Sequence, residues 1–138
     1  MRFMIIVKAN RDSEAGVMPD EKMLDTMAKY HEELAKAGVL VDASGLKASR
    51  TGWRVRYSSN GKQQVVDGPF TEAKELVAGY TIINVKSREE ALEWTRRFPN
   101  PHSTEGEIEV RPLFELEDFE PGPAIDRFRD IGVGVRQA

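Results

Sequence analysis

Residues 65–80 read VVDGPFTEAKELVAGY: a β-prone run, an interruption, and a second β-prone run. The interruption, Asp67-Gly68-Pro69-Phe70, joins an acidic residue to two residues that break regular structure and to an aromatic ring. A plain turn needs the glycine or the proline but has no use for the phenylalanine. We therefore expect the tetrapeptide to be a rigid platform that holds a carboxylate and an aromatic side chain at the edge of a sheet.

Strands are predicted on both sides of this interruption. Upstream, Trp53, Val55 and Tyr57 alternate with charged residues, which is typical of a half-buried strand. Asn60-Gly61 predicts a tight hairpin turn, because both residues tolerate positive φ. Downstream, a short helical turn over 71–75 leads into a strand over 77–85.

The rest of the chain completes an alternation of strands and helices. The chain is expected to begin with a strand over 3–7 and a loop over 8–16. A helix should follow from 19–21 to Gly38, with one face formed by Met23, Leu24, Met27, Tyr30, His31 and Leu34, and then a strand over 39–46. After the interruption and its strand, we expect a helix from a capping box at 87–90 to about Phe98 and a strand over 108–116, which Pro112 confines to a sheet edge. This order reduces to βαββαβ with an extra hairpin strand, a ferredoxin-like α+β fold with an antiparallel sheet.

Two helices can cover only one face of such a sheet. The other face should carry apolar side chains such as Phe3, Ile5 and Tyr80, or their alternates along the strands. A second copy of the chain is the simplest partner for this face, so we expect a homodimer.

Composition narrows the class of protein. The 138 residues are 40% hydrophobic and 31% charged, which suits one folded domain, and the net charge of −3 argues against nucleic acid as a partner. Without cysteine, disulfides, thiolate metal sites and cysteine nucleophiles are excluded. The short apolar start at 3–7 fits neither a signal peptide nor a membrane span, so we expect a soluble, cytoplasmic protein with no membrane partner.

The signature DGPFTEAKELVAGY, together with AGVLVDASGL (37–46), ALEWTRRFP (91–99) and GEIEVRPLFELEDF (106–119), resembles the YCII-related, or DGPF-domain, family. The resemblance covers residues 1–119 in order and leaves 120–138 as a C-terminal extension. It implies a dimeric α+β barrel of unassigned activity. In some members a His–Asp pair faces a cleft, and others are associated with extracytoplasmic-function sigma factors. After Gly45 this sequence has Leu46-Lys47 where close relatives are expected to carry a histidine.

The acid–base candidates are few. His31 lies on the helix face that should meet the sheet, and it is read either as a core histidine satisfied by a hydrogen bond or as a cleft histidine paired with Asp67. Asp67 itself is read either as a cap for the following turn or as the carboxylate of that pair. His102, in the loop NPHSTEG, is expected to be solvated.

Other side chains could line a ligand site. Phe70 would form a pocket wall, Lys8 could point into the same cleft, and Arg54 and Arg56 share one strand face that is either solvated or an anion site. No phosphate loop, dinucleotide fingerprint or HExxH motif occurs, and two distant histidines make a poor metal site, so neither cofactor nor metal is expected.

The tail after Phe119 is expected to be peripheral to the fold. It is rich in proline and glycine, and Ile125, Phe128 and Ile131 offer a narrow apolar stripe that could contact a partner subunit. Taken together, the sequence predicts a homodimeric small-molecule-binding or regulatory module, with a small-molecule enzyme that uses His31 and Asp67 as the alternative.

Overall fold

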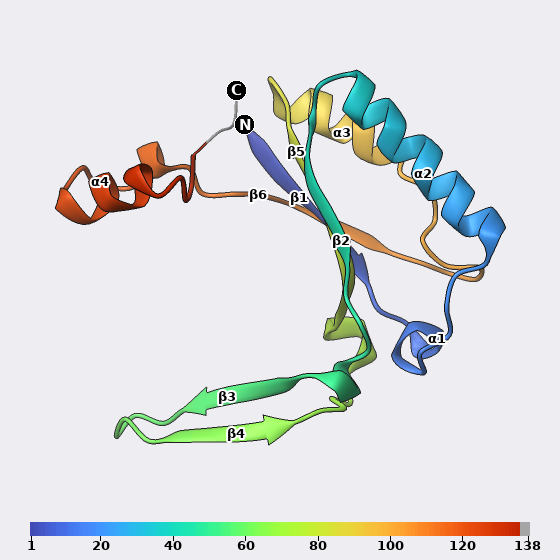
Figure 1. The fold of residues 1–138 in the computed structure, drawn as a ribbon, viewed down its shortest axis with the longest axis horizontal. Coiled ribbons are helices and arrows are strands. Elements are labelled where there is room, and N and C mark those ends of the chain that lie inside the picture. The colour runs from blue at the N-terminus through green and yellow to red at the C-terminus, as the bar shows by residue number, and fades with distance from the viewer. Residues whose placement is uncertain (136–138) are drawn as a thin grey trace.

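The computed structural model describes residues 1–135, which form a four-stranded antiparallel sheet with two helices on one face (Figure 1). The strands lie in the order β2-β5-β1-β6, and each pairs antiparallel with its neighbours. Their bounds are β1 Arg2–Lys8, β2 Leu40–Gly45, β5 Val77–Asn84 and β6 Ile108–Pro112. With helices α2 Glu21–Lys36 and α3 Arg88–Arg96 as crossovers, this is the predicted ferredoxin-like frame, and β6 with Pro112 lies at an edge as expected.

Helix α2 begins and ends where its sequence predicts. The Asp20 carboxylate accepts a hydrogen bond from the Met23 amide at 2.8 Å, and Gly38 follows the last turn with a φ of 73°. The helix face meets the sheet only in its later turns, where Tyr30 and Leu34 are buried. Leu24 is predicted on the same face but is exposed, since it lies in the first turn of α2, ahead of the turns that contact the sheet.

Helix α3 is anchored by the predicted Ser87 cap. The Ser87 hydroxyl accepts from the Glu90 amide at 3.1 Å, while the Glu90 carboxylate accepts from the Lys86 amide rather than from the cap residue itself. Ala91 and Thr95 face the sheet, and Phe98, just beyond the helix, packs against the core.

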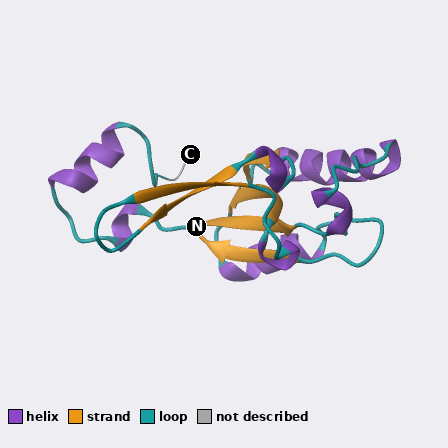
Figure 2. Cartoon of the chain, turned by 90° about the horizontal axis from the view of Figure 1, so that it is seen from below, coloured by secondary structure: helices purple, strands orange, loops and turns teal. Residues whose placement is uncertain are grey.

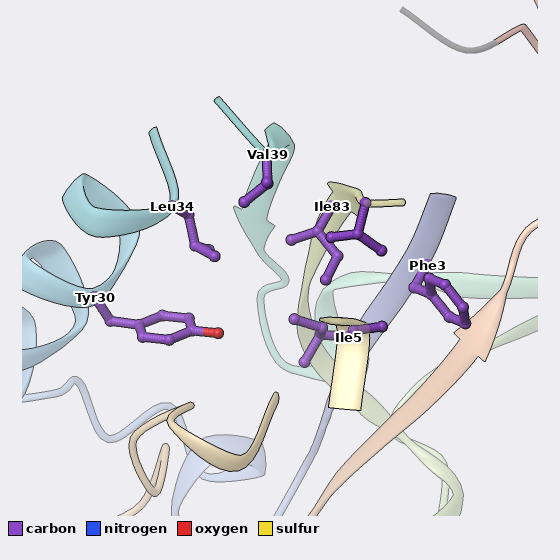
Figure 3. Packing of buried hydrophobic residues seen from close by; sticks show 8 residues of the cluster. Phe3, Ile5, Tyr30, Leu34, Val39 and Ile83 are labelled. Atoms are coloured by element: carbon purple, nitrogen blue, oxygen red, sulfur yellow. The ribbon is translucent and has the colours of Figure 1, made fainter. Parts of the chain in front are cut away.

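The core lies between the two helices and the sheet (Figure 3). Ile5, Leu34 and Ile83 are fully buried, one each from β1, α2 and β5. Burying a side chain of this size contributes about 1.5–3 kcal/mol, so these contacts fix the register of the three elements. The Tyr30 hydroxyl, at the side of this cluster, donates to the Trp94 carbonyl at 2.7 Å, and burial raises its pKa to about 12.

The opposite face of the sheet carries the alternates of the core residues. Phe3 and Ile5 are buried beneath the helices, so the expectation that they lie on the uncovered face is wrong for these two residues. Met4 pairs with Ile82 and Ile6 with Tyr80, and the alternation of side chains along a strand places these four on the uncovered face. An apolar stripe therefore runs along the two central strands, away from the helices.

The predicted hairpin is present and forms a two-stranded sheet of its own. Strands β3 Trp53–Tyr57 and β4 Gln63–Asp67 pair antiparallel, and the turn between them uses Gly61 at a φ of 82°. Every residue of β3 is exposed, which corrects the expectation of a half-buried strand. The hairpin extends away from the main sheet (Figure 1), and every residue of its two strands except Val66 is exposed.

Two further helices lie outside the ferredoxin-like frame. The segment predicted as a loop over 8–16 holds α1 Arg11–Glu14, because the Asn10 and Ser13 side chains bond each other's backbone amides in a capping box. Near the other end, α4 Pro123–Asp130 extends to the same side as the hairpin, away from α2 and α3, in both views (Figures 1 and 2). None of its residues is buried. In the described part of the chain, no helix is long and apolar enough to cross a bilayer.

Candidate functional site

His31 connects helix α2 to strand β5. Its Nδ1 lies 2.8 Å from the Met27 carbonyl oxygen and its Nε2 lies 2.9 Å from the Thr81 hydroxyl. Because a carbonyl only accepts, Nδ1 carries a proton, and in the neutral ring Nε2 accepts from Thr81. The ring also makes edge contacts with Tyr30 and Phe98. Both nitrogens therefore have partners inside the fold.

Asp67 lies elsewhere, at the end of β4 and opposite Trp53. It is exposed, and its carboxylate accepts no hydrogen bond from any residue in 1–135. The cap interpretation is wrong, because the Phe70 amide donates to the Ser49 hydroxyl at 3.0 Å instead. Neither nitrogen of His31 bonds to the Asp67 carboxylate. An acid–base role for His31 and Asp67 stays a prediction.

The turn after Asp67 packs against the short helical turn Ser49–Thr51. The Gly68–Pro69 bond is cis, and the Gly68 amide donates to the Gly52 carbonyl at 3.0 Å. A Cβ on Gly68 would lie 1.9 Å from the Ser49 carbonyl oxygen, so only glycine fits this approach. The two ends of the hairpin therefore meet at a fixed point.

Phe70 and the two arginines occupy the hairpin side of this turn. The Arg54 guanidinium lies 3.7 Å from the centre of the Phe70 ring, a cation–π contact. Arg56 shares that strand face, is exposed, and has no partner among the described residues. Phe70 thus contacts the base of the hairpin, and its role as a pocket wall stays a prediction.

Lys8 ends strand β1 beside β6. Its Nζ lies 3.5 Å from the Glu109 carboxylate. A hydrogen bond from Arg111, and then the charge of Lys8, hold the pKa of the Glu109 carboxyl below its ordinary value. The Lys8 carbonyl accepts from His102 Nε2 at 2.8 Å, which makes His102 half-buried rather than solvated as predicted.

A pocket of about 800 Å³ lies beyond the end of the sheet, on the side of α1. Its walls come from α1 and the loop after it, the start of α2, the segment after β2, and the loop after α3. The lining residues are Asn10, Asp12, Ser13, Gly16, Val17, Met18, Pro19, Asp20, Met23, Gly45, Leu46, Lys47, Ala48, Arg50, Thr51, Ala78, Pro101, His102 and Ser103. The six site residues predicted from the sequence are not among them.

One carboxylate joins two walls of this pocket. Glu14, the last residue of α1, accepts from the Ser49 amide at 2.9 Å and from the Ser49 hydroxyl at 2.5 Å. Since the same hydroxyl accepts from Phe70, the chain of bonds runs from α1 to the DGPF turn. The pocket walls and the base of the hairpin are thus held by one hydrogen-bonded connection.

The charged side chains that line the pocket differ in whether they already have a partner. Lys47 and Arg50 form no ion pair or hydrogen bond with another side chain in residues 1–135. Asp20 is engaged as the cap of α2, which leaves Asp12 as the acidic side chain free to oppose the cations. Among the described residues, no cluster of three histidine or carboxylate side chains could hold a metal ion.

Comparison with known proteins gives a family, a sequence relative and a structural likeness. The sequence model described as the YCII-related domain matches residues 1–117. An uncharacterized protein of Rhizobium meliloti (strain 1021) is 33% identical over 94 residues, which is 68% of this chain and 75% of that protein.

Among solved structures, the chain resembles 5-chloro-2-hydroxyhydroquinone dehydrochlorinase (TftG) from Burkholderia phenoliruptrix AC1100, solved in complex with 2,5-dihydroxybenzoquinone. The match covers 87% of this chain and 100% of that one, at 12% identity and a TM-score of 0.42. A likeness of this size says nothing about activity.

Proposed function

The chain belongs to the YCII-related domain family, and we propose that it is a homodimeric module that binds a small organic acid in the pocket beside α1. The observation that carries this proposal is the pocket of about 800 Å³ in which two uncommitted cations, Lys47 and Arg50, stand among apolar walls. Its volume lies in the range of about 300–1,000 Å³ that is usual for small-molecule sites.

The walls suggest a ligand with an apolar body. Val17, Met18 and Leu46 are exposed although their side chains are large and apolar, and all three line the pocket. A ligand that covers them removes apolar surface from water, at about 25 cal/mol per Å². An aromatic or branched acid would place its ring or chain there and its carboxylate near Lys47 or Arg50.

The pocket is also held in shape before a ligand arrives. The Glu14–Ser49 bonds fix α1 against the turn that carries Arg50. His102 is held against the Lys8 carbonyl from the opposite wall. Such preorganisation lowers the cost of ordering side chains on binding.

The dimer is proposed from the uncovered face of the main sheet. Met4, Ile6, Tyr80 and Ile82 form the apolar stripe on that face, and α4 extends away from it rather than across it. A stable interface of this kind buries about 2,000 Å² or more. Sedimentation equilibrium at micromolar concentration should give the mass of two chains; a monomer would contradict the proposal.

The binding proposal is tested by thermal shift with pairs of ligands. Small aromatic carboxylates should raise the melting temperature, and their amides of the same shape should not. At a ligand concentration of 100 Kd the expected stabilisation is about 2.7 kcal/mol.

Two matched variants locate the site. Arg50→Gln should lose the shift, whereas Arg56→Gln, a similar exposed arginine outside the pocket, should keep it. A full shift in Arg50→Gln, or no shift with any acid tried, would contradict the proposed pocket. Catalysis by His31 and Asp67, a cytoplasmic location and a link to an extracytoplasmic-function sigma factor stay separate predictions.

A further inference from the structure

The hairpin carries an apolar face that the rest of residues 1–135 leaves exposed. The pairing of Val55 with Val65 places both on one face together with Trp53 and Tyr57. Trp53 is 65% exposed and Tyr57 72% exposed. Isolated two-stranded hairpins are marginally stable in water, so a face of this kind is expected to have a partner.

A second exposed apolar surface lies near the other end of the chain. We call residues 114–133 the C-terminal arm; it contains the helical turn Leu116–Asp118 and α4. Its exposed large apolar side chains are Phe114, Phe119, Phe128, Ile131 and Val133. The Phe114 and Phe119 rings contact each other at 5.0 Å between centres, and Ile131 is 72% exposed.

The hairpin and the C-terminal arm extend to the same side of the main sheet. Both views show them on the side opposite α2 and α3 (Figures 1 and 2), and Figure 1 shows them at opposite ends of the open face. A second subunit packed on that face would lie between them. The hairpin and the C-terminal arm would then each extend along the partner subunit.

Their charges are opposite. The hairpin carries Arg54, Arg56 and Lys62 against a single carboxylate, Asp67. Residues 117–131 of the C-terminal arm carry five carboxylates, Glu117, Asp118, Glu120, Asp126 and Asp130, against two arginines. Arg54 and Arg56 lie on the other face of the thin hairpin, yet the field of a charge reaches about 8 Å at physiological salt.

We propose that in the dimer the apolar face of each hairpin packs against the C-terminal arm of the partner subunit. The inference rests on the proposed dimer and adds its arrangement. In a two-fold dimer any contact between two different surfaces occurs twice, so both hairpins and both arms would be covered. The alternative two-fold arrangement sets hairpin against hairpin. It brings together two hairpins that each carry three cations against one carboxylate, and like charges across an interface are costly.

Cross-linking between co-expressed variants tests the arrangement. The chain has no cysteine, so Tyr57→Cys and Ile131→Cys each introduce a single reactive thiol. Each variant carries one of these thiols, so a flexible bis-maleimide that joins the pair has joined two different chains. We expect a covalent dimer from Tyr57→Cys co-expressed with Ile131→Cys. A covalent dimer should be absent when Ala28→Cys, exposed on the helix side, replaces Tyr57→Cys.

The outcomes separate this inference from the dimer itself. A cross-linked dimer from Tyr57→Cys alone would show hairpin against hairpin and overturn the inference. A dimer in sedimentation that gives no hairpin-to-arm cross-link would overturn the inference and leave the dimer standing. A monomeric wild type would overturn both.

Charge reversal gives a second measurement. Arg56→Glu with Lys62→Glu should weaken dimerisation about tenfold or more, because the hairpin would then repel the acidic arm. Adding Glu120→Lys and Asp130→Lys in the same chain should restore much of the affinity. An unchanged dissociation constant in the first variant would overturn the inference even if the cysteine variants fail to fold.

Discussion

The main sheet and the hairpin sheet are built from similar strand-forming residues, yet one is buried and the other is not. On the main sheet, Ile5 and Ile83 are fully buried beneath helices. On the hairpin, Trp53 and Val65 are each 65% exposed. The difference teaches that alternation along a strand creates two faces but does not decide what covers them.

The two sheets also differ in how their polar groups are satisfied. Beneath the helices, His31, Tyr30 and Thr81 all have hydrogen-bond partners within the fold. On the hairpin, Asp67 and Arg56 have none among residues 1–135. The helix-covered side is thus complete in one chain, and the hairpin side is available to a partner.

Leu34→Ala should produce the largest loss of stability. The side chain is fully buried between α2 and the sheet, and such truncations cost about 2–5 kcal/mol. The matched control is Leu24→Ala, an exposed leucine on the same helix, which should cost less than about 1 kcal/mol. Chemical denaturation of both variants measures the difference, and equal losses would break the comparison between covered and open regions.

Gly68→Ala should cause the second-largest loss of stability, because Gly68 lies at the junction between the two sheets. Its Cβ would approach the Ser49 carbonyl oxygen to 1.9 Å, and overpacking of this kind costs about 1–3 kcal/mol. Gly52→Ala is the control in the same turn, since its Cβ would meet the same oxygen at 3.8 Å. A Gly68→Ala protein as stable as the wild type would show that the hairpin base is not held as described.

Tyr30→Phe should have a smaller effect at neutral pH. It removes the bond to the Trp94 carbonyl, at a cost of about 0.5–1.5 kcal/mol. Tyr57→Phe on the exposed hairpin serves as the control and should be close to neutral, because its hydroxyl has no hydrogen-bond partner in residues 1–135.

The dependence of stability on pH above pH 10 makes this prediction more specific. The pKa of Tyr30 is about 12 when folded, above the ordinary value of 10.0, so the unfolded chain loses its proton first as pH rises. The free energy of unfolding should therefore fall between pH 10 and 12 by about 1.4 kcal/mol per pH unit. The share of that slope due to this residue should vanish in Tyr30→Phe and persist in Tyr57→Phe.

Asp67→Asn should have the smallest effect on stability, within about 0.5 kcal/mol, because the exposed carboxylate accepts no hydrogen bond from residues 1–135. Glu14→Gln, whose carboxylate accepts two bonds from Ser49, should cost more. If Asp67 acts in binding or catalysis, the Asn variant folds normally and loses that activity. A clear drop in melting temperature would contradict the observed surroundings of Asp67.

Most of the main sheet could be predicted from the sequence. Local signals indicated its elements: the helix start at 19–21, the capping box at Ser87 and the edge proline Pro112 each act within a few residues, while the Asn60-Gly61 turn indicated the separate hairpin. Such signals depend on local side-chain hydrogen bonds and backbone geometry, not on tertiary packing. The order of strands then followed from the ferredoxin-like pattern.

The pocket could not be predicted in the same way. Leu46, Arg50 and His102 meet only through tertiary packing, and none of their neighbours in sequence indicates it. Helix α1 did carry a signal, the reciprocal pair of Asn10 and Ser13, which differs from the usual capping box in its last residue. His31, in contrast, fits its core interpretation, since its partners lie on its own helix and on the strand beneath it.

The meeting of Gly52 and Gly68 at the hairpin base bears on how freely the length of the hairpin can change. Because these two residues are joined by a hydrogen bond of 3.0 Å, the hairpin between them begins and ends at the same point of the fold. Lengthening or shortening that excursion changes the entropy of loop closure by only about 0.6 kcal/mol for each doubling. A longer or shorter hairpin in this chain should therefore leave the pocket on the other side of the junction unchanged.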